Sequence, residues 1–376
     1  MVIYLDNAAT SYPKPTAVAS AIQNALEVAT SPGRSLHKLA RNATLIVQEA
    51  RQKIAALLGC TEESIVLTYG CTDALNMAIK GILREGDHVV TTALEHNSVL
   101  RPLRRLSKQG IIKLSIVDFD EQGYVSASKI ANHLTPQTKL IAVTAASNVL
   151  GTVQPVAEIA ELAQKSKVLL LVDAAQALGT VKLSLEGIDL LACGGHKGLL
   201  GPTGTGFLYV ATKTKLNCWR EGGTGSDSLS ALQPEEMPYH LEAGTPNVLG
   251  LAGLAAAIDY LLERTVSDIA KHELRLTELL LEGLAKLPKV KVYGNRFDRR
   301  IATVSLSVHG YSSEEVAAIL DESFQIAVRG GLHCAPLVHQ QLGTTEQGLV
   351  RVSFGPFNKV DDVEALLAAL LEISQC

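Results

Sequence analysis

Several features that mark secreted, membrane or nucleic-acid-binding proteins are missing from this sequence of 376 residues. The first residues, MVIYLDNAAT, have no basic stretch ahead of an apolar run, so we expect no signal peptide. The apolar run VLLLVDAAQALG is interrupted by Asp173, and no uncharged run is long enough to cross a bilayer. The formal net charge of −4 offers no basic surface to a polyanion. We therefore expect neither a membrane nor a nucleic acid as partner.

Cysteine is scarce and scattered. The six cysteines form no CxxC pair and no cluster with the spacing of metal ligands, and a disulfide framework is not expected in a chain of this length. We predict a reducing, cytoplasmic location and no metal site. In that compartment most cysteines are small buried hydrophobic residues, so any reactive one needs a separate argument.

The composition is that of a globular protein, with 47% hydrophobic and 19% charged residues, and the length indicates about two domains. Up to about residue 249, strand-like runs such as SIVLTYG, DHVVTTA and KVLLLVDAAQ alternate with helical runs. Several of these strands are almost continuously apolar, as strands are when helices cover both faces of a sheet. The sequence therefore predicts an α/β fold with a mostly parallel, doubly wound sheet.

The pattern changes near residue 250. A long helical stretch is followed by short strands and helices, which indicates a smaller α+β unit. We predict a large domain over residues 15–249 and a small C-terminal domain over residues 250–376, to which the N-terminal segment 1–14 is attached.

Polar groups among small residues follow five of the predicted strands. SIVLTY is followed by GCTDA, HVVTTAL by EHNS, LIAVTAA by SNVLGT, VLLLV by DAAQ, and LLAC by GGHKG. In sheets of this kind, ligands bind beyond the carboxyl ends of the strands. We therefore expect these segments to build one site.

Three of these segments have a recognisable chemistry. Asp173 ends an apolar strand, which suits a helix N-cap but also a cationic ring nitrogen such as that of pyridoxal phosphate (PLP). Lys197 stands between glycines, either as a surface lysine or as an amine that forms a Schiff base. GCTDA offers backbone N–H groups and the Thr72 hydroxyl to a phosphate. A nucleotide-dependent enzyme is disfavoured, because neither GxxxxGK[ST] nor a GxGxxG helix start is present.

RGGLHCAP, residues 329–336, raises the question of whether Cys334 is reactive. Taken alone, it is better explained as a structural loop cysteine. Gly330 and Gly331 would give the loop freedom, and Arg329 and His333 would favour the reactive thiolate. We expect the remaining cysteines outside GCTDA to be non-catalytic: Cys60, Cys193, Cys218 and Cys376.

In this order and spacing, LDNAAT, GCT, EHNS, SNxxG, DAAQ, GHK, EAGT and RGGLHCAP resemble the class V aminotransferase-like PLP enzymes. The resemblance runs from residue 4 to about residue 370 and is strongest to the cysteine desulfurases, with selenocysteine lyases as near relatives. RxGxHCAP resembles the group II branch. The resemblance implies the PLP-dependent transferase fold type I and conversion of L-cysteine to L-alanine, with the sulfur held as a persulfide on Cys334 and passed to an acceptor.

The resemblance also implies roles for single residues around the cofactor. Lys197 would form the Schiff base with PLP and take the substrate α-proton. Asp173 would pair with the ring nitrogen, and Gln176 would donate to the ring hydroxyl oxygen. His96 would stack on the ring and assist proton transfer. The phosphate would be held by Cys71 through its backbone, Thr72 and His196.

On the substrate side, the resemblance implies that Asn148 and Arg351 bind the carboxylate, Arg351 through a bidentate pair, with Arg329 beside them. His37 would stand at the entrance of the pocket. Thr245 would reach the phosphate of the neighbouring subunit's cofactor, which implies a homodimer.

The chain departs from the family pattern at Gly194, where relatives usually carry Ser or Thr. One phosphate hydroxyl is therefore missing, and we expect weaker phosphate anchoring or compensation by backbone N–H groups. The interval from Cys334 to Arg351 is short, which predicts a compact catalytic loop. Family members with a compact loop resemble enzymes that a sulfur-acceptor protein accelerates.

Three questions stay open at the level of the sequence. The substrate could be selenocysteine or cystine instead of cysteine, which would make the protein a selenocysteine lyase or a cystine C–S lyase. A non-catalytic regulator on the same fold is a further alternative. The sulfur could serve iron–sulfur cluster assembly, thiolated cofactors or selenium metabolism.

Overall fold

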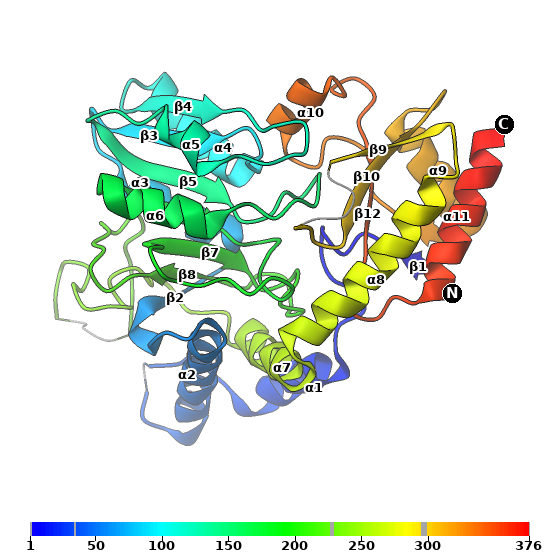
Figure 1. Ribbon diagram of the computed structural model, residues 1–376. Coiled ribbons are helices and arrows are strands. Elements are labelled where there is room, and N and C mark those ends of the chain that lie inside the picture. The colour runs from blue at the N-terminus through cyan, green and yellow to red at the C-terminus, as the bar shows by residue number, and fades with distance from the viewer. Residues whose placement is uncertain (1, 34, 226–228, 295–298, 376) are drawn as a thin grey trace.

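The centre of the molecule is a seven-stranded sheet with the strand order β2-β8-β7-β6-β5-β3-β4 (Figure 1). The computed structural model describes residues 2–33, 35–225, 229–294 and 299–375. Neighbouring strands of this sheet are parallel, except that β8 is antiparallel to β2 and to β7. The predicted α/β fold with a mostly parallel sheet is confirmed. The strands are β2 (Ile65–Thr68), β3 (His88–Thr92), β4 (Lys113–Val117), β5 (Thr138–Thr144), β6 (Leu169–Asp173), β7 (Leu190–Gly194) and β8 (Gly206–Val210).

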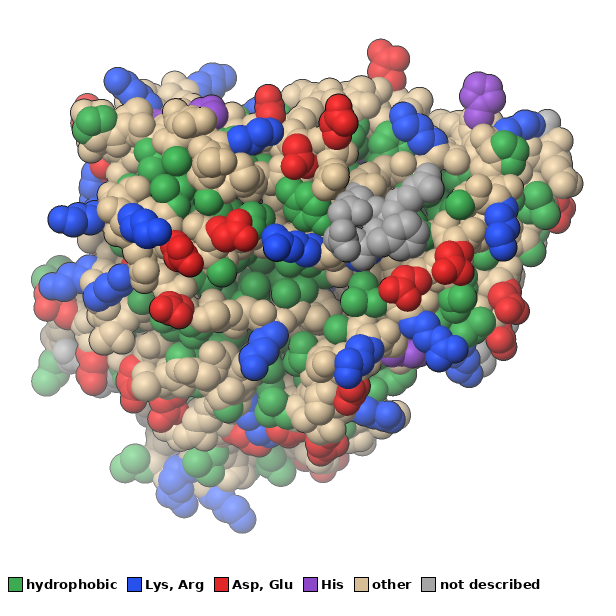
Figure 2. All heavy atoms as spheres, in the orientation of Figure 1, with side chains coloured by type: hydrophobic (Ala, Val, Ile, Leu, Met, Phe, Trp, Pro, Cys, Tyr) green, Lys and Arg blue, Asp and Glu red, His purple; other side chains and the backbone are tan. Residues whose placement is uncertain are grey.

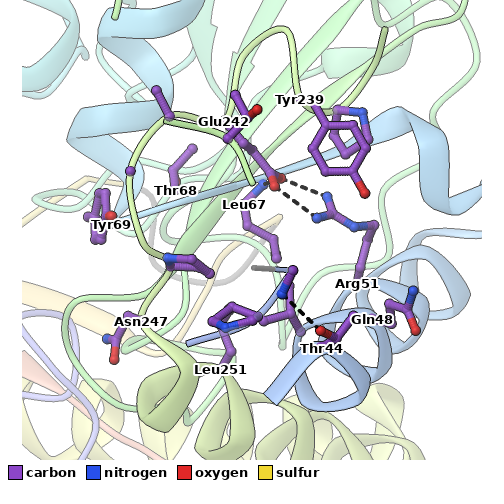
Figure 3. Close-up of a pocket in the computed structure, with 18 of the residues that line it drawn as sticks. Thr44, Gln48, Arg51, Leu67, Thr68, Tyr69, Tyr239, Glu242, Asn247 and Leu251 are labelled. Atoms are coloured by element: carbon purple, nitrogen blue, oxygen red, sulfur yellow. Dashed lines mark hydrogen bonds and ion pairs between the residues drawn. The ribbon is translucent and has the colours of Figure 1, made fainter. Parts of the chain in front are cut away.

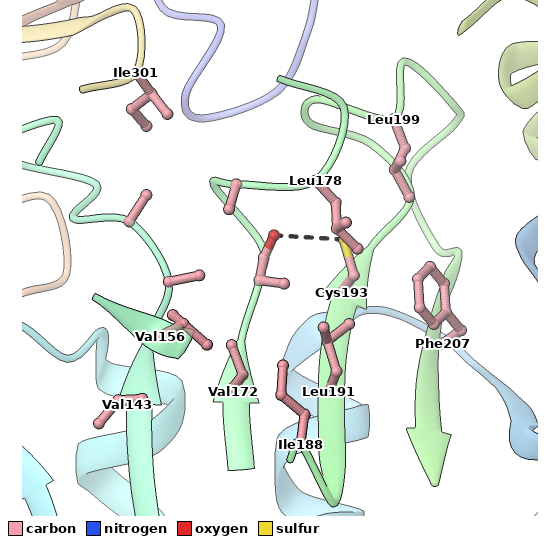
Figure 4. Close-up of a cluster of buried hydrophobic side chains, with 14 of the residues drawn as sticks. Val143, Val156, Val172, Leu178, Ile188, Leu191, Cys193, Leu199, Phe207 and Ile301 are labelled. Atoms are coloured by element: carbon pink, nitrogen blue, oxygen red, sulfur yellow. Dashed lines mark hydrogen bonds between the residues drawn. The ribbon is translucent and has the colours of Figure 1, made fainter. Parts of the chain in front are cut away.

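The middle strands are apolar on both faces, and this explains their continuous hydrophobic runs. Successive side chains of a strand point to opposite faces of the sheet. In β6, Leu170 and Val172 join one hydrophobic cluster, whereas Leu171 joins a second cluster on the other face. In β7, Leu191 and Cys193 belong to the first cluster (Figure 4). Cys193 is therefore a buried core residue, as expected.

Helices cover the sheet on both faces. α3 and α4 supply the cluster that contains Leu171, and α2, α6 and α7 supply the other. α2 begins at Lys38, with His37 as its N-cap. The helices of this unit are α1 (Thr16–Val28), α2 (Lys38–Leu58), a 3₁₀ turn (Glu62–Ser64), α3 (Cys71–Ile82), α4 (Asn97–Lys108), α5 (Ala127–Ala131), α6 (Val156–Ser166) and α7 (Val248–Arg264).

A smaller unit follows, built on the antiparallel sheet β12-β10-β9 and packed around its own hydrophobic cluster. The N-terminal strand β1 pairs in parallel with β11, so the first residues belong to this unit. Both chain ends lie on this side of the molecule in Figure 1. The elements are β1 (Ile3–Tyr4), α8 (Val266–Leu284), β9 (Val290–Tyr293), β10 (Thr303–Val308), α9 (Ser313–Phe324), β11 (Ile326–Ala327), α10 (Pro336–Leu342), β12 (Val350–Ser353) and α11 (Val360–Gln375).

α7 packs with the large unit. Its residues Leu251, Leu254 and Ile258 lie in the same cluster as α2 and the central sheet. From this packing we infer that the large unit extends to about Thr265, the residue between α7 and α8, beyond the boundary at residue 249 that the sequence predicts.

The surface carries charges of both signs, which are interspersed on the face that Figure 2 shows. Within the described residues, no helix is long and apolar enough to cross a membrane. The same part of the chain contains no group of three or more His, Cys, Asp or Glu side chains placed to hold a metal ion. The described cysteines are free thiols; Cys376 lies outside the described residues.

Candidate active site

The five segments that follow the strands line one cavity of about 650 Å³, so their expected convergence is observed. This volume lies within the range of small-molecule and cofactor sites, about 300–1,000 Å³. One predicted residue after each strand lines the cavity: Cys71 after β2, His96 after β3, Asn148 after β5, Asp173 at the end of β6 and Lys197 after β7. The smaller unit closes the wall with Arg329, His333 and Arg351.

Asp173 is held in place through one of its two carboxylate oxygens. The side chain is buried, and Oδ1 accepts a hydrogen bond from the Ala175 backbone N–H at 2.9 Å. This is a local turn, since no helix begins after β6 at this point. The Cys71 thiol donates to the same Oδ1 at 3.4 Å. Burial, reinforced by the Asp173 charge, raises the pKa of the Cys71 thiol well above its usual value, so the thiol keeps its proton and remains a donor.

Lys197 lies in a turn that glycines make possible. It is half-buried and lines the cavity together with Gln176. A Cβ atom on the next residue, Gly198, would lie 2.2 Å from the Leu178 carbonyl oxygen. Only glycine allows this turn to pack against the segment that follows β6, so the packing fixes where the lysine emerges.

His96 is a neutral imidazole with a defined tautomer. Burial, followed by the Lys197 charge, lowers the pKa of His96 to about 4. The ring caps α4, where Nδ1 accepts a hydrogen bond from the Ser98 backbone N–H at 3.0 Å. Because Nδ1 is an acceptor, the proton of the neutral ring is on Nε2. His96 therefore offers an N–H donor to the cavity at neutral pH.

The start of α3, which the resemblance assigns to a phosphate, lines one end of the cavity. Cys71 and Thr72 are its first two residues, and their backbone N–H groups belong to the helix start. The Thr72 hydroxyl lies 2.7 Å from the Ser98 hydroxyl, which in turn lies 2.9 Å from His96 Nδ1. A Cβ atom at Gly194 would lie 3.4 Å from His196 Cδ2, which is ordinary van der Waals contact.

The peptide that joins His196 to Lys197 is held by the N-terminal segment. The His196 carbonyl oxygen accepts hydrogen bonds from the Ser11 backbone N–H at 3.0 Å and from Lys14 Nζ at 3.0 Å. The Thr10 hydroxyl donates to it at 3.1 Å. Burial lowers the pKa of Lys14 to about 8. Burial, followed by the charges of Lys197 and Lys14, lowers the pKa of His196 to about 4, so this ring is also neutral.

Arg351 is almost fully enclosed, with 1% of its side chain exposed. Nη2 forms an ion pair with Asp6 Oδ1 at 2.7 Å, and Nη1 donates to the Asn148 carbonyl oxygen at 3.3 Å. The Asn148 side-chain amide donates to the His333 carbonyl oxygen at 2.7 Å. Asn148 and Arg351 are thus adjacent, as predicted. Asp6 shares the guanidinium, so a substrate carboxylate would bind beside this carboxylate or displace it.

Cys334 lies in a fixed turn between the two units. His333 and Cys334 both have left-handed backbone angles, with φ of 49° and 58°, which are rare for residues other than glycine and cost about 1–3 kcal/mol each. The turn is held by hydrogen bonds from the Asn97 N–H to the Cys334 carbonyl oxygen at 2.8 Å and from His333 Nε2 to the Leu349 carbonyl oxygen at 2.9 Å. Strain held in this way is typical of functional turns.

Two expectations about this turn need correction. Gly330 gives close packing and not freedom, because a Cβ atom there would lie 2.6 Å from the Ser313 carbonyl oxygen. His333 does not favour the thiolate by charge, because burial and then the Arg351 charge lower its pKa to about 2 and keep the ring neutral. Arg329 supplies the positive charge, with Nη2 at 3.7 Å from the Cys334 sulfur. Cys334 itself is half-buried and is not among the residues that line the cavity, whereas its neighbours Arg329 and His333 are.

Comparison with known proteins agrees with this geometry. A family model described as Aminotransferase class-V matches residues 3–366. The chain belongs to the class-V aminotransferase family. A probable cysteine desulfurase from Methanothermobacter thermautotrophicus is 36% identical over 99% of this chain and 94% of its own length. A probable cysteine desulfurase from Pyrococcus abyssi is 35% identical over 99% and 94%.

Solved structures of cysteine desulfurases have the same fold. The apo structure of a cysteine desulfurase from Thermococcus onnurineus is 36% identical, with a TM-score of 0.93 over 100% of this chain and 95% of that one. A cysteine desulfurase from Escherichia coli is 29% identical, with a TM-score of 0.90 over 99% and 95%. The fold class that the sequence resemblance implies is therefore confirmed.

Two residues that the class-V resemblance places near the cofactor lie outside this cavity wall in the single chain. His37 is exposed and caps α2, where Nδ1 accepts from the Ala40 N–H at 3.2 Å. Thr245 is exposed, and its carbonyl oxygen accepts from the Tyr69 hydroxyl at 2.8 Å. Their predicted roles remain predictions.

Sequence reasoning missed three polar residues that support the site of this class-V protein. Ser98 connects His96 to Thr72, Asp6 pairs with Arg351, and Lys14 holds the His196 carbonyl. The sequence did carry a signal for them, because each lies in or next to a recognised motif. Ser98 is in EHNS, Asp6 is in LDNAAT, and Lys14 is in the adjoining SYPKP.

Proposed function

We propose that this protein is a PLP-dependent cysteine desulfurase that converts L-cysteine to L-alanine and holds the released sulfur as a persulfide on Cys334. The observation that carries this proposal is the placement of the Arg329 guanidinium 3.7 Å from the Cys334 sulfur, because Arg329 lines the same cavity as Lys197 and Asp173. The 36% identity to a probable cysteine desulfurase supports it.

The residues fit PLP. The cavity is large enough, the start of α3 suits a phosphate, and Asp173 is buried with Oδ1 already bonded to Ala175 and Cys71. The second oxygen of Asp173 is then the one we assign to the ring nitrogen, and Gln176 to the ring hydroxyl. Lys197 would hold the aldehyde carbon. When bound, PLP supplies an electron-accepting ring that stabilises negative charge at the substrate α-carbon.

The protein groups divide the proton transfers and the binding of substrate. Lys197 takes the α-proton and returns it. His96 donates from Nε2, since its pKa of about 4 keeps the ring neutral. Arg351 and Asn148 orient the substrate carboxylate at the wall shared with the smaller unit, with Arg329 beside them.

The sulfur step belongs to Cys334. Its thiolate attacks the substrate sulfur, a sulfur–sulfur bond forms, and the bond between the substrate sulfur and Cβ breaks with its electron pair left on carbon. Protonation at that carbon completes alanine, so no external oxidant is required. Arg329 stabilises the thiolate before the attack.

We also propose a homodimer through the surface near Thr245. Gly244 and Pro246, on either side of Thr245, line a second cavity of about 270 Å³, which also contains the Arg51–Glu242 pair (Figure 3). Two leucines, Leu36 and Leu232, are 88% and 81% exposed. Their exposure suits a subunit interface.

A reducing cytoplasm remains the proposed compartment, and the free thiols of the described cysteines agree with it.

The decisive experiment measures alanine and protein persulfide after purified protein loaded with PLP is mixed with L-cysteine. Wild type should form both. Cys334→Ser should form neither while keeping the absorbance of bound PLP. Cys218→Ser is a matched control, because Cys218 is also half-buried but its thiol contacts Glu221 and does not line the cavity, and it should behave like wild type.

Two results would redirect the proposal. Alanine release that survives in Cys334→Ser would contradict the persulfide step. Turnover of cystine or selenocysteine by Cys334→Ser, without turnover of cysteine, would favour direct C–S or C–Se cleavage on the same fold.

A further inference from the structure

α4 carries a row of basic side chains. The helix contains Arg101, Arg104, Arg105 and Lys108 and no acidic residue. All four basic side chains are exposed, whereas Val99, Leu100, Pro102 and Leu103 face the core. The chain as a whole has a net charge of −4, so this row does not follow from a basic composition.

The row begins at the turn that carries Cys334. The Asn97 backbone N–H, at the start of α4, donates to the Cys334 carbonyl oxygen at 2.8 Å. Residues 97, 101, 104 and 108 follow one another at intervals of three or four, so they lie on one face of the helix. With a rise of about 1.5 Å per residue, the row extends roughly 16 Å from the Cys334 turn. The Arg101 charge is close enough to contribute to the lowered pKa of His96.

The charges of this row are not neutralised by neighbouring side chains. Among the described residues, none of the four cations takes part in an ion pair, whereas Arg51, Lys53 and Arg220 each pair with a carboxylate. Arg329, which lies 3.7 Å from the Cys334 sulfur, continues the positive charge into the site. The result is a positive surface that ends at the reactive sulfur.

We propose that this basic row, formed by Arg101, Arg104, Arg105 and Lys108, docks the protein that accepts sulfur from Cys334, and that the docking face of this acceptor is acidic. The inference rests on the proposed function, because it requires sulfur on Cys334. In the transfer, the acceptor thiolate attacks the outer sulfur of the persulfide. A new sulfur–sulfur bond forms, the old one breaks, and Cys334 leaves as a thiolate, so no oxidant or reductant is needed.

A protein segment is the partner that the geometry favours over other anions. The acceptor has to bring a thiol to a half-buried sulfur at the end of the row, and neither a nucleic acid nor a lipid surface supplies one. Opposite charges on two partners raise their association rate by about 10- to 1,000-fold, and salt weakens the effect because the Debye length is only about 8 Å at physiological ionic strength.

The test uses the full-length protein loaded with PLP and then with L-cysteine, so that discharge of the persulfide is followed in a single turnover. Three acceptors are compared: dithiothreitol, a synthetic peptide with one cysteine flanked by glutamates, and the same peptide with lysines in place of the glutamates. The variant is Arg104→Glu/Lys108→Glu, which leaves Arg101 beside His96 intact. The matched control is Lys271→Glu/Arg275→Glu, an exposed pair with the same spacing on α8.

Wild type and control should discharge to the acidic peptide about tenfold faster than to the basic peptide at low salt, with the difference shrinking at high salt. The α4 variant should lose or reverse this preference while its rate with dithiothreitol stays unchanged. Equal rates for both peptides in wild type, or an unchanged preference in the α4 variant, would overturn the proposal. So would row-dependent binding to RNA or anionic vesicles without a peptide preference. If no persulfide forms on Cys334 after L-cysteine is added and before any acceptor is present, the proposed function fails and this inference fails with it.

Discussion

Gly194 leaves space at the end of the cavity that we assign to the phosphate. A Cβ atom there would lie 3.4 Å from His196 Cδ2 and 3.6 Å from the Cys71 Cβ, so a small side chain fits without displacing its neighbours. Because the family pattern that this chain resembles has a hydroxyl at this position, we expect Gly194→Ser to tighten PLP binding. One additional hydrogen bond to a charged phosphate contributes about 1.5 kcal/mol, or roughly tenfold in the dissociation constant.

The measurement is equilibrium dialysis of PLP against the apo protein. Gly194→Ala is the control, because it adds the Cβ atom without the hydroxyl and should leave the dissociation constant near that of wild type. Equal tightening by Ala and Ser would show that the hydroxyl is not responsible. Weaker binding by both would show that the backbone at Gly194 itself approaches the phosphate.

At the scale of one element, α8 carries a carboxylate at a position where the helical periodicity of its buried face predicts an apolar residue. Glu273 shares the buried face of α8 with Ile269, Leu276 and Leu280. It lines a small cavity of about 40 Å³ that Lys197 also lines. Burial raises the pKa of Glu273 to about 8, so the carboxyl is neutral at physiological pH.

This raised pKa predicts how stability depends on pH. In the unfolded chain a glutamate ionises near pH 4.3, so between about pH 4.5 and pH 8 the folded state holds one more proton than the unfolded state. The contribution of Glu273 to the free energy of unfolding therefore falls as pH rises through this window and is constant above it. Glu273→Gln should remove this contribution and stabilise the protein at pH 9, by on the order of a few kcal/mol.

Urea unfolding at pH 5, 7 and 9 checks this. Glu278→Gln, at an exposed position on the same helix, is the matched control and should shift stability by less than about 0.5 kcal/mol at each pH. A Glu273→Gln variant whose stability changes with pH as steeply as that of wild type would contradict a neutral buried carboxyl.

The elements also show which parts of the fold the sequence could predict. The strand ends with Asp173, Lys197 and Cys71 were predictable, because strand periodicity and the polar residues that end each strand are local in sequence. The α2 start was not, because His37 provides a cap that lies ahead of the apolar periodicity. The place of α7 in the large unit was not predictable either, because its packing against α1 and α2 depends on tertiary contacts.

At the scale of the whole molecule, the N-terminal segment connects the two units at the site. Asp6 pairs with Arg351, the Ala8 carbonyl oxygen accepts from the Gln176 amide at 2.9 Å, and Lys14 donates to the His196 carbonyl. These contacts join residues more than 160 positions apart in the chain. No local pattern encodes such pairs, so the sequence could indicate the motif LDNAAT but not what its residues contact.

The proposed homodimer allows a prediction about two subunits together. If Thr245 serves the partner's site, a dimer of one Lys197→Ala subunit and one Thr245→Ala subunit contains one site with both residues intact. That site has Lys197 from the second subunit and Thr245 from the first. Denaturing the two variants together and refolding them at equal concentration should give random pairing, with intact sites at about one quarter of the wild-type number.

The measurement is alanine formation from L-cysteine by the co-refolded mixture at saturating PLP. Each variant refolded alone sets the baseline, and Lys197→Ala alone should be inactive. Activity that rises to about one quarter of wild type only after co-refolding would require Thr245 to act across the interface. If Thr245 acted within its own chain, every site in the mixture would lack one of the two residues, and the mixture would show no more than the average of the two variants. Because the chain presents Thr245 on an exposed loop and Thr245 is not among the residues that line its own cavity, we expect complementation.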